Sequence, residues 1–155
     1  MVFATGQVIK PENVPNDFVL FIAYARGVSE NIDYAINGTA AEIVALAISG
    51  INNYFSRLIS TVDDLQDLWG DEIDEFIDFQ FVLKQNYEEF SSIYAKYYNS
   101  GKQLTLEDQQ FLETVKNSFD LLLDAMQQKE GDVNPKIISK EYFSKVISDF
   151  LMSAR

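Results

Sequence analysis

Apolar residues recur at intervals of three and four along most of this chain, and this spacing places them on one face of an α-helix. The pattern is clearest over 15–36, where the apolar stripe consists of Phe18, Phe21, Ile22, Ala25, Val28 and Ile32. Alternation of apolar and polar residues, which marks a half-buried strand, never lasts for more than a few residues. The chain also has only three prolines and seven glycines, few for the frequent turns of an all-β protein. The sequence therefore predicts an all-α fold.

Four long helices and a shorter C-terminal helix account for these stripes. We expect them at about 15–36, 39–58, 71–98, 106–130 and 140–151. The second helix is expected to turn the following residues inward: Ile43, Leu46, Ala47, Gly50, Ile51, Tyr54, Phe55 and Leu58. The stripe of the third contains Ile73, Phe76, Ile77, Leu83, Tyr87, Phe90, Tyr94 and Tyr97. Because Phe79 and Phe81 widen that stripe beyond one face, the third helix is expected to be central.

Local signals mark several of the expected helix ends. Gly38 follows an asparagine and predicts a left-handed stop for the first helix. Thr39 and Glu42 match a capping box, in which each side chain binds the other residue's backbone N–H. A second start signal at Thr61 predicts a break or a short extra helix before residue 70. Ser139 is expected to cap the last helix.

The short connections between these helices favour an antiparallel bundle. A length of 155 residues fits a single helical domain over 1–155, in which residues 1–13 form an irregular N-terminal arm. An apolar fraction of 47%, with one Trp, eight Tyr and twelve Phe, argues against disorder despite a net charge of −12. The fold class that follows is an antiparallel helical bundle of four long helices plus a shorter C-terminal helix.

The composition removes several kinds of chemistry. The chain has no cysteine and no histidine, so it lacks thiolates, the commonest general base and the commonest transition-metal ligand. There is no glycine-rich phosphate loop and no Ser–His–Asp set. We therefore expect no catalytic residues, no metal and no cofactor.

Charge and hydropathy restrict the partners and the location. The uncharged run 43–56 is shorter than the roughly 20 apolar residues of a membrane span. The N-terminus resembles no signal peptide, so a cytoplasmic location is expected. A chain of net charge −12 repels phosphates, so direct nucleic-acid binding is not expected either.

Two short acidic motifs resemble those of magnesium enzymes. The segment Asp63-Asp64-Leu65-Gln66-Asp67 matches the Asp-Asp-x-x-Asp pattern of the isoprenoid synthases, an all-helical family whose aspartates hold magnesium on a diphosphate. That resemblance covers five residues, and the chain has no second aspartate-rich motif and only three arginines. The segment Glu72-x-x-Glu75 resembles the magnesium ligands of the helical nucleotide pyrophosphohydrolases, but their second Glu-x-x-Asp pair is missing after residue 75.

The acids themselves are concentrated in one segment. Residues 58–83 contain eight carboxylates and no Lys or Arg: Asp63, Asp64, Asp67, Asp71, Glu72, Asp74, Glu75 and Asp78. In a continuous helix Asp67, Asp71, Asp74, Glu75 and Asp78 would share one face and repel one another. A basic partner would compensate this repulsion, whereas a solvated face that keeps the chain soluble is the simpler alternative. Trp69, if exposed, would complete a binding surface with the eight carboxylates, although a core position is the favoured interpretation of this residue.

Three functions are compatible with such a surface. The first is a non-catalytic interaction module, of the inhibitor, immunity-protein or assembly-chaperone type, that covers a basic surface of a partner protein. The second is a self-assembling structural subunit, for instance of a viral particle, in which the arm 1–13 exchanges between copies of a homo-oligomer. The third is a magnesium-dependent enzyme acting on a diphosphate. We favour the first, because the two magnesium motifs lack the second motif that each chemistry requires.

Overall fold

The computed structural model of the chain describes residues 15–99, 101–127 and 134–154. These ranges contain five α-helices, α1 (Asn16–Asn37), α2 (Ala41–Trp69), α3 (Phe76–Asn99), α4 (Leu106–Met126) and α5 (Lys140–Ser153), with a short 3-10 helix η3 (Pro135–Ile138) before α5. No strand occurs in them, so the all-α prediction is confirmed. The predicted arm 1–13 lies outside the described residues.

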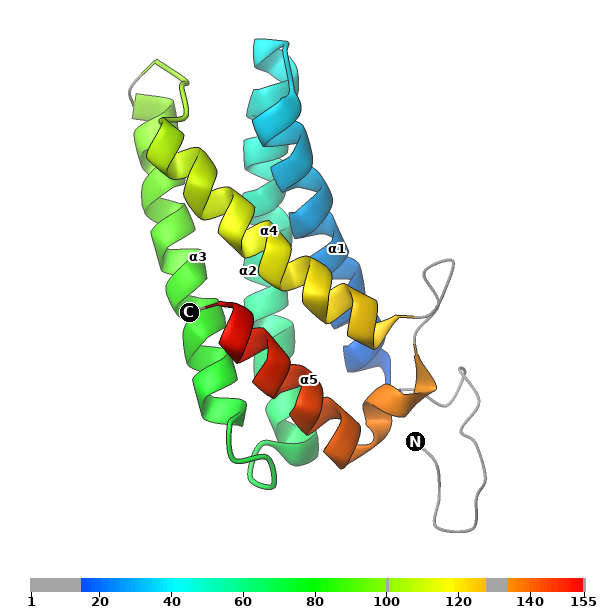
Figure 1. Cartoon of the computed structure of the whole chain (residues 1–155). Helices are drawn as coiled ribbons and strands as arrows, with labels where there is room; N and C mark the ends of the chain where they lie inside the picture. Colours follow the sequence, from blue (N-terminus) through cyan, green and yellow to red (C-terminus); the bar gives the residue numbers. More distant parts are fainter. Residues whose placement is uncertain (1–14, 100, 128–133, 155) are drawn as a thin grey trace.

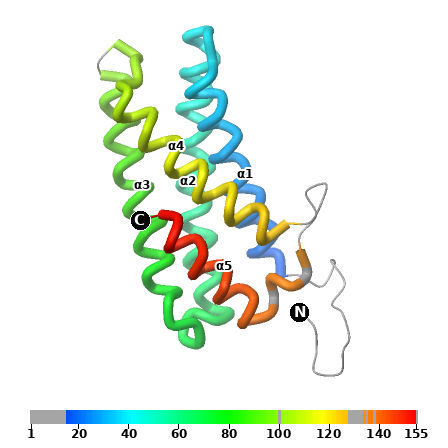
Figure 2. Tube along the Cα trace, viewed as in Figure 1, coloured from blue at the N-terminus to red at the C-terminus, as the bar shows by residue number. Residues whose placement is uncertain are grey.

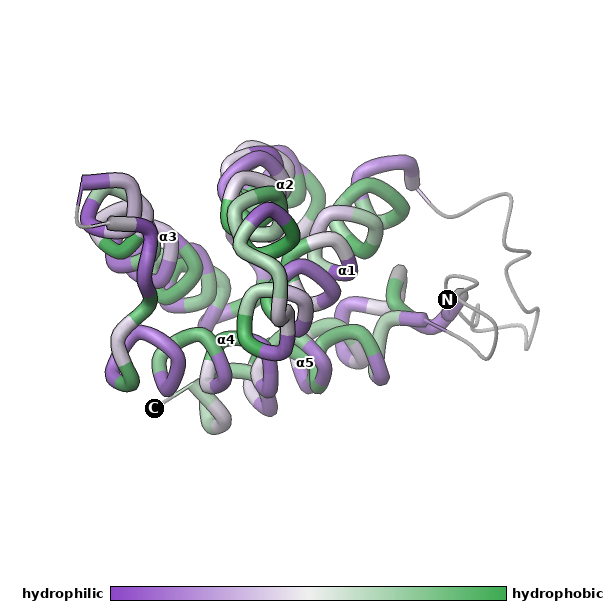
Figure 3. Tube along the Cα trace, turned by 90° about the horizontal axis from the view of Figure 1, so that it is seen from above, coloured by the Kyte–Doolittle hydropathy of each residue, from purple (hydrophilic) through white to green (hydrophobic). Residues whose placement is uncertain are grey.

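The helices pack in two layers. Helices α1, α2 and α3 lie beside one another, and α4 and α5 cross them on one side (Figure 1). The view from above in Figure 3 separates these layers, with α3 at one edge. Successive helices run in opposite directions, as the tube in Figure 2 shows, so the antiparallel bundle is confirmed. None of the described helices is long and apolar enough to cross a lipid bilayer.

Aromatic rings fill the core that the five helices share. Phe143 of α5 lies edge-on to Phe18 of α1, with ring centroids 5.2 Å apart. Phe150, one turn from the end of α5, meets Phe79 of α3 edge-on at 5.3 Å. Phe55 of α2 makes a similar contact with a phenylalanine of α4. Such buried rings contribute apolar area and geometry-dependent attraction, and they join the two layers.

Two glycines allow α1 and α2 to approach closely. A Cβ atom on Gly27 would lie 2.5 Å from the ring of Tyr54, and one on Gly50 would lie 2.5 Å from the amide oxygen of Asn31. The Asn31 amide in turn donates a 2.7 Å hydrogen bond to the carbonyl of Gly27. Each helix therefore has a glycine at a position where a side chain of the other helix lies so close that any Cβ would collide with it.

The second helix is longer than predicted. The break expected at Thr61 is wrong, because α2 continues without interruption to Trp69. Thr61 is buried, and its hydroxyl donates to the carbonyl of Arg57 one turn earlier, so it is an interior residue and not a cap. The third helix, expected from about residue 71, begins only at Phe76, and residues 70–75 form the connection.

Of the predicted helix ends, those of α1 and α2 differ in detail. Gly38 is extended, with φ −68° and ψ 136°, so the left-handed stop is wrong. A Cβ there would lie 2.6 Å from the Tyr34 carbonyl oxygen, which explains the glycine. The capping box at Thr39 is also wrong, since Ala40 occupies the N-cap without a side-chain hydrogen bond. The predicted cap at Ser139 is confirmed, because its hydroxyl accepts from the Tyr142 N–H.

Several residues predicted to face inward are exposed instead. On α2, Ile43, Leu46 and Tyr54 are 48%, 73% and 39% exposed. On α3, Ile77 and Phe81 are 68% and 63% exposed, so the predicted central position of this helix is wrong. The physical reason is the layer arrangement, in which α2 and α3 each bury only the narrow stripe that faces the neighbouring helices.

Candidate partner-binding surfaces

The eight predicted carboxylates gather at the end of the bundle where α2 passes into α3 (Figure 1). Asp63, Asp64 and Asp67 belong to the end of α2, Asp71, Glu72, Asp74 and Glu75 to the connection, and Asp78 to the first turn of α3. We call these eight residues the acidic turn. Seven are exposed and Glu75 is half-buried. Because the helix is interrupted over 70–75, the acids do not share one helix face as a continuous helix would require.

Two members of the acidic turn have partners within the protein. The Asp63 carboxylate contacts Lys84 at 3.1 Å and accepts a 3.2 Å hydrogen bond from the amide of Gln80. Glu75 accepts a short hydrogen bond from the hydroxyl of Ser148 on α5. The other six acids form no ion pair and no side-chain hydrogen bond with any other residue that the structure describes. Most of the acidic turn is therefore available to an outside partner.

The helix dipoles favour the acid on the α3 side of the acidic turn and disfavour those on the α2 side. Asp78 lies in the first turn of α3, where the partial positive charge of a helix N-terminus favours a carboxylate. Asp64 and Asp67 lie near the C-terminus of α2, whose partial negative charge disfavours them, and the last turn of α2 has no basic residue. These two aspartates therefore lower the stability of the helix that carries them.

Trp69 belongs to the core more than to the surface. Its half-buried ring lies 6.0 Å from the ring of Phe18 and 6.3 Å from that of Phe143. Leu68 on α2 is 39% exposed, and on α3 two large apolar side chains that stand one turn apart, Ile77 and Phe81, are exposed as well. Sequence reasoning missed both, because their spacing fits the buried stripe of the same helix.

A polar hollow of about 220 Å³ lies where the acidic turn meets the start of α5. Glu72, Asp74 and Glu75 line one side, and Lys140 and Glu141 line the other. Glu141's own backbone N–H and the Ser139 hydroxyl hold the pKa of its carboxyl below the usual value, which keeps it ionised. Within the described ranges no three carboxylates are arranged to hold a metal ion. The chemistry that this hollow offers is the acceptance of hydrogen bonds from cationic groups.

Two buried polar clusters elsewhere have structural explanations. Burial works to raise the pKa of Asp108, but hydrogen bonds from Lys96 and from Thr105, with the Lys96 charge, lower it overall. This carboxylate closes a capping box with Thr105 at the start of α4. Between α1 and α4, Ser29 donates to Asp120, which also pairs with Lys116 at 2.7 Å. The hydrogen bond from Ser29 to Asp120 joins α1 to α4, so this cluster has a structural role.

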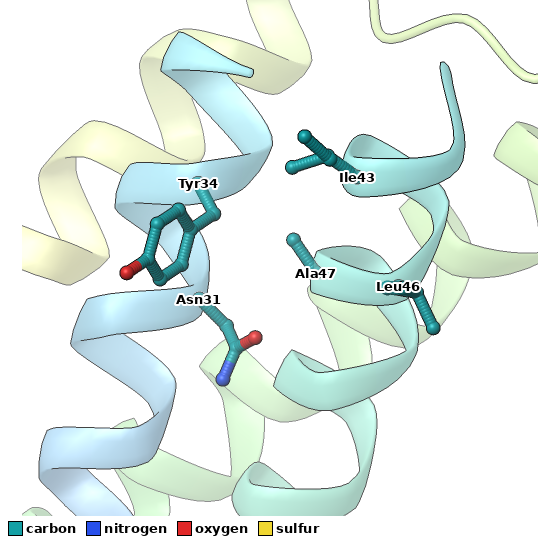
Figure 4. A pocket seen from close by; sticks show the side chains of 5 residues that line it. All are labelled: Asn31, Tyr34, Ile43, Leu46 and Ala47. Atoms are coloured by element: carbon teal, nitrogen blue, oxygen red, sulfur yellow. The ribbon is translucent and has the colours of Figure 1, made fainter. Parts of the chain in front are cut away.

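A second hollow, of about 340 Å³, lies between α1 and α2 near the other end of α2. It is lined by Asn31, Tyr34, Ile43, Leu46 and Ala47 (Figure 4). We call this site the α1–α2 hollow. Unlike the acidic turn, it is bounded mainly by apolar side chains. It could not be recognised from the sequence, because Ile43 and Leu46 fit a buried stripe.

Comparison of the chain with protein-family models, with curated proteins and with solved structures found no match.

Proposed function

We propose that the protein is a non-catalytic acidic interaction module that binds a basic surface of a partner protein, as inhibitors, immunity proteins and assembly chaperones do. The observation that carries the proposal is the acidic turn, in which eight carboxylates gather at one end of the bundle and only two of them have partners among the described residues. Exposed carboxylates of one sign attract a basic protein before contact and accept hydrogen bonds from Lys and Arg after it.

The position of Asp64 and Asp67 adds support to this proposal. An acid that only improves solubility can occupy any exposed position, including helix N-termini where it also stabilises the helix. These two occupy the unfavourable end of α2. A partner that supplies positive charge there offsets the repulsion, so we expect complex formation to stabilise the module.

A pair of charge-matched variants tests the proposal. The first removes three exposed acids of the acidic turn without internal partners, through Asp71→Asn, Asp74→Asn and Asp78→Asn. The control removes three exposed acids of α4 and α5, through Glu113→Gln, Asp124→Asn and Asp149→Asn. Both lose the same charge, so a difference between them reports the location of the charge and not its total.

The measurement is affinity capture from an extract of the native host at low and high salt, with the captured proteins identified and quantified. We expect the wild type and the control to retain the same basic protein at low salt, and the acidic-turn variant to lose it while remaining folded. High salt should weaken capture by every form. Equal capture by the acidic-turn variant and the control would refute the proposal, as would the absence of any basic protein at low salt.

The alternative of a self-assembling subunit depends on the arm 1–13, which lies outside the described residues, and it stays a prediction.

A further inference from the structure

The α1–α2 hollow exposes apolar side chains that the fold itself does not use. Tyr34 is 59% exposed, while Ile43 and Leu46 are exposed to 48% and 73%. Figure 4 shows Ile43 and Ala47 projecting from α2 toward α1, where Tyr34 and Asn31 stand, and Leu46 on the outer side of α2. Exposed apolar residues scattered singly are ordinary, but here three line the same hollow, as at a docking site.

The shape of the hollow depends on its smallest lining residue, Ala47. Ala47 is buried and has only a methyl group, so it forms the floor, whereas the longer Ile43 and Tyr34 form opposite walls. Asn31 closes one end and is held by its hydrogen bond to Gly27. Since this bond fixes the amide, the hollow is formed in advance and can receive an apolar side chain without rearrangement of the helices.

The charges around the hollow indicate what kind of surface carries that side chain. Three exposed acids on α1 and α2, Glu30, Asp33 and Glu42, are the sequence neighbours of the lining residues Asn31, Tyr34 and Ile43. Residues 27–56 contain no Lys and no Arg. A second copy of this chain seated on the same face would bring six like charges together, which disfavours self-association there. A partner with Lys or Arg around its apolar anchor would instead complement the acids.

We propose that the α1–α2 hollow is a docking site for a basic amphipathic helix of a partner protein, which places an apolar side chain between Tyr34 and Ile43. A helix fits because its own apolar stripe, flanked by cationic residues, matches an apolar strip that itself runs along a helix. The site is separate from the acidic turn, since Leu46 and Asp67 lie about 30 Å apart along α2 at about 1.5 Å per residue. It therefore does not depend on the proposed function of the acidic turn.

The test uses the full-length protein labelled with ¹⁵N and a synthetic helical peptide of about 15 residues, with leucines on one face and lysines on its flanks. Two control peptides replace the leucines by serines or the lysines by glutamates. Backbone amide shifts locate the bound peptide, and the titration gives its dissociation constant. The protein variants are Leu46→Ser and Ile43→Ser, with Leu106→Ser as the matched control, because Leu106 is 71% exposed on α4 and does not line the hollow.

We expect the leucine–lysine peptide to shift the amides of Asn31, Tyr34 and Ala47 in a saturable manner. Burial of part of a leucine side chain predicts about ten-fold weaker binding for Leu46→Ser and Ile43→Ser, and none of this loss for Leu106→Ser. The serine and glutamate peptides should bind weakly or not at all. The variant of Asp71, Asp74 and Asp78 should bind the peptide at this site as the wild type does, which separates this result from that of the capture experiment.

Three outcomes would overturn the proposal. The first is the absence of saturable shifts at the hollow, or shifts confined to the acidic turn. The second is equal binding of the glutamate peptide, which would remove the charge argument. The third is a concentration-dependent dimer in sedimentation that Leu46→Ser abolishes, which would make a second copy of the chain the occupant.

Discussion

Asp108 gives the sharpest prediction for stability, because one carboxylate has two separable roles. It is buried, it accepts a 3.1 Å hydrogen bond from the Thr105 N–H, and it contacts the Lys96 ammonium at 2.7 Å. Asp108→Ala removes both contacts, whereas Asp108→Asn keeps one oxygen that can accept from Thr105 and loses both the charge and the hydrogen bond from Lys96.

The two contacts set the size of the effect. Loss of a capping interaction costs about 1 kcal/mol. The contact with Lys96, whose side chain is 48% exposed, contributes at most about 0.5 kcal/mol after discounting for solvent. We therefore expect Asp108→Ala to lower the free energy of unfolding by about 1.5 kcal/mol, which corresponds to a fall of about 3–6 °C in melting temperature for a domain of this size. Asp108→Asn should lower the free energy of unfolding by about a third of that amount, the part that comes from the contact with Lys96.

The effect should depend on pH in a defined direction. The pKa of Asp108 is lower in the folded protein than in the unfolded chain, where it is about 3.9. The contribution of its charge is therefore complete above about pH 5, and it declines as the pH falls through the folded-state pKa. Urea unfolding followed by circular dichroism at about pH 7 and about pH 3 checks this. The reasoning would be refuted if the difference in free energy of unfolding between the wild type and Asp108→Asn were the same at both pH values. Equal stability of the wild type and Asp108→Ala would refute it as well.

Three further changes have predictable results. Asp64→Asn with Asp67→Asn should raise the free energy of unfolding by about 0.5–1 kcal/mol at low salt, because it removes charges from the negative end of α2; a fall in the urea midpoint would contradict this. Gly27→Ala should destabilise the wild type, because the added Cβ collides with the ring of Tyr54. In a Tyr54→Ala background the same substitution should stabilise the protein by about 1 kcal/mol, because alanine has the higher helix propensity. A double-mutant cycle measured by thermal unfolding checks this difference in sign. Phe143→Ala should lower the free energy of unfolding by about 3–5 kcal/mol, because the Phe143 ring contacts aromatic rings of three other helices. It should also shift the fluorescence of the only tryptophan. An unchanged melting temperature would show that Phe143 does not hold these helices together.

The helix starts that sequence reasoning located correctly depend on local chemistry. The start of α5 at Ser139 is an example, because the hydroxyl and the N–H that it accepts from lie within one turn. Thr61 shows why the same reasoning fails elsewhere. A threonine hydroxyl can cap a following helix or donate to the carbonyl one turn before it, and the choice depends on whether the chain stays packed on its neighbours.

The two candidate surfaces also differ in how far they could be predicted from the sequence. The acidic turn could be predicted, because its residues are close in sequence and a short connection keeps them close in space. Which of the aromatic side chains is exposed could not. Trp69 packs against Phe18, which is far away in the sequence, and Phe81 is exposed because α3 lies at the edge of its layer. The α1–α2 hollow was missed for the same reason, since Ile43 has the spacing of a core residue.

The close pairing of α1 and α2 has a consequence for how the chain folds. Residues 38–40 alone connect the two helices, so this hairpin forms contacts between residues that are near in sequence and loses little entropy on closing. The positions where each helix holds a side chain over a glycine of the other also fix the register of the pair. We expect the hairpin to be formed in the folding transition state, with α4 and α5 docking later. Kinetic φ-values near one for Ile51→Val in α2, and near zero for Val146→Ala in α5, are the signature of this order.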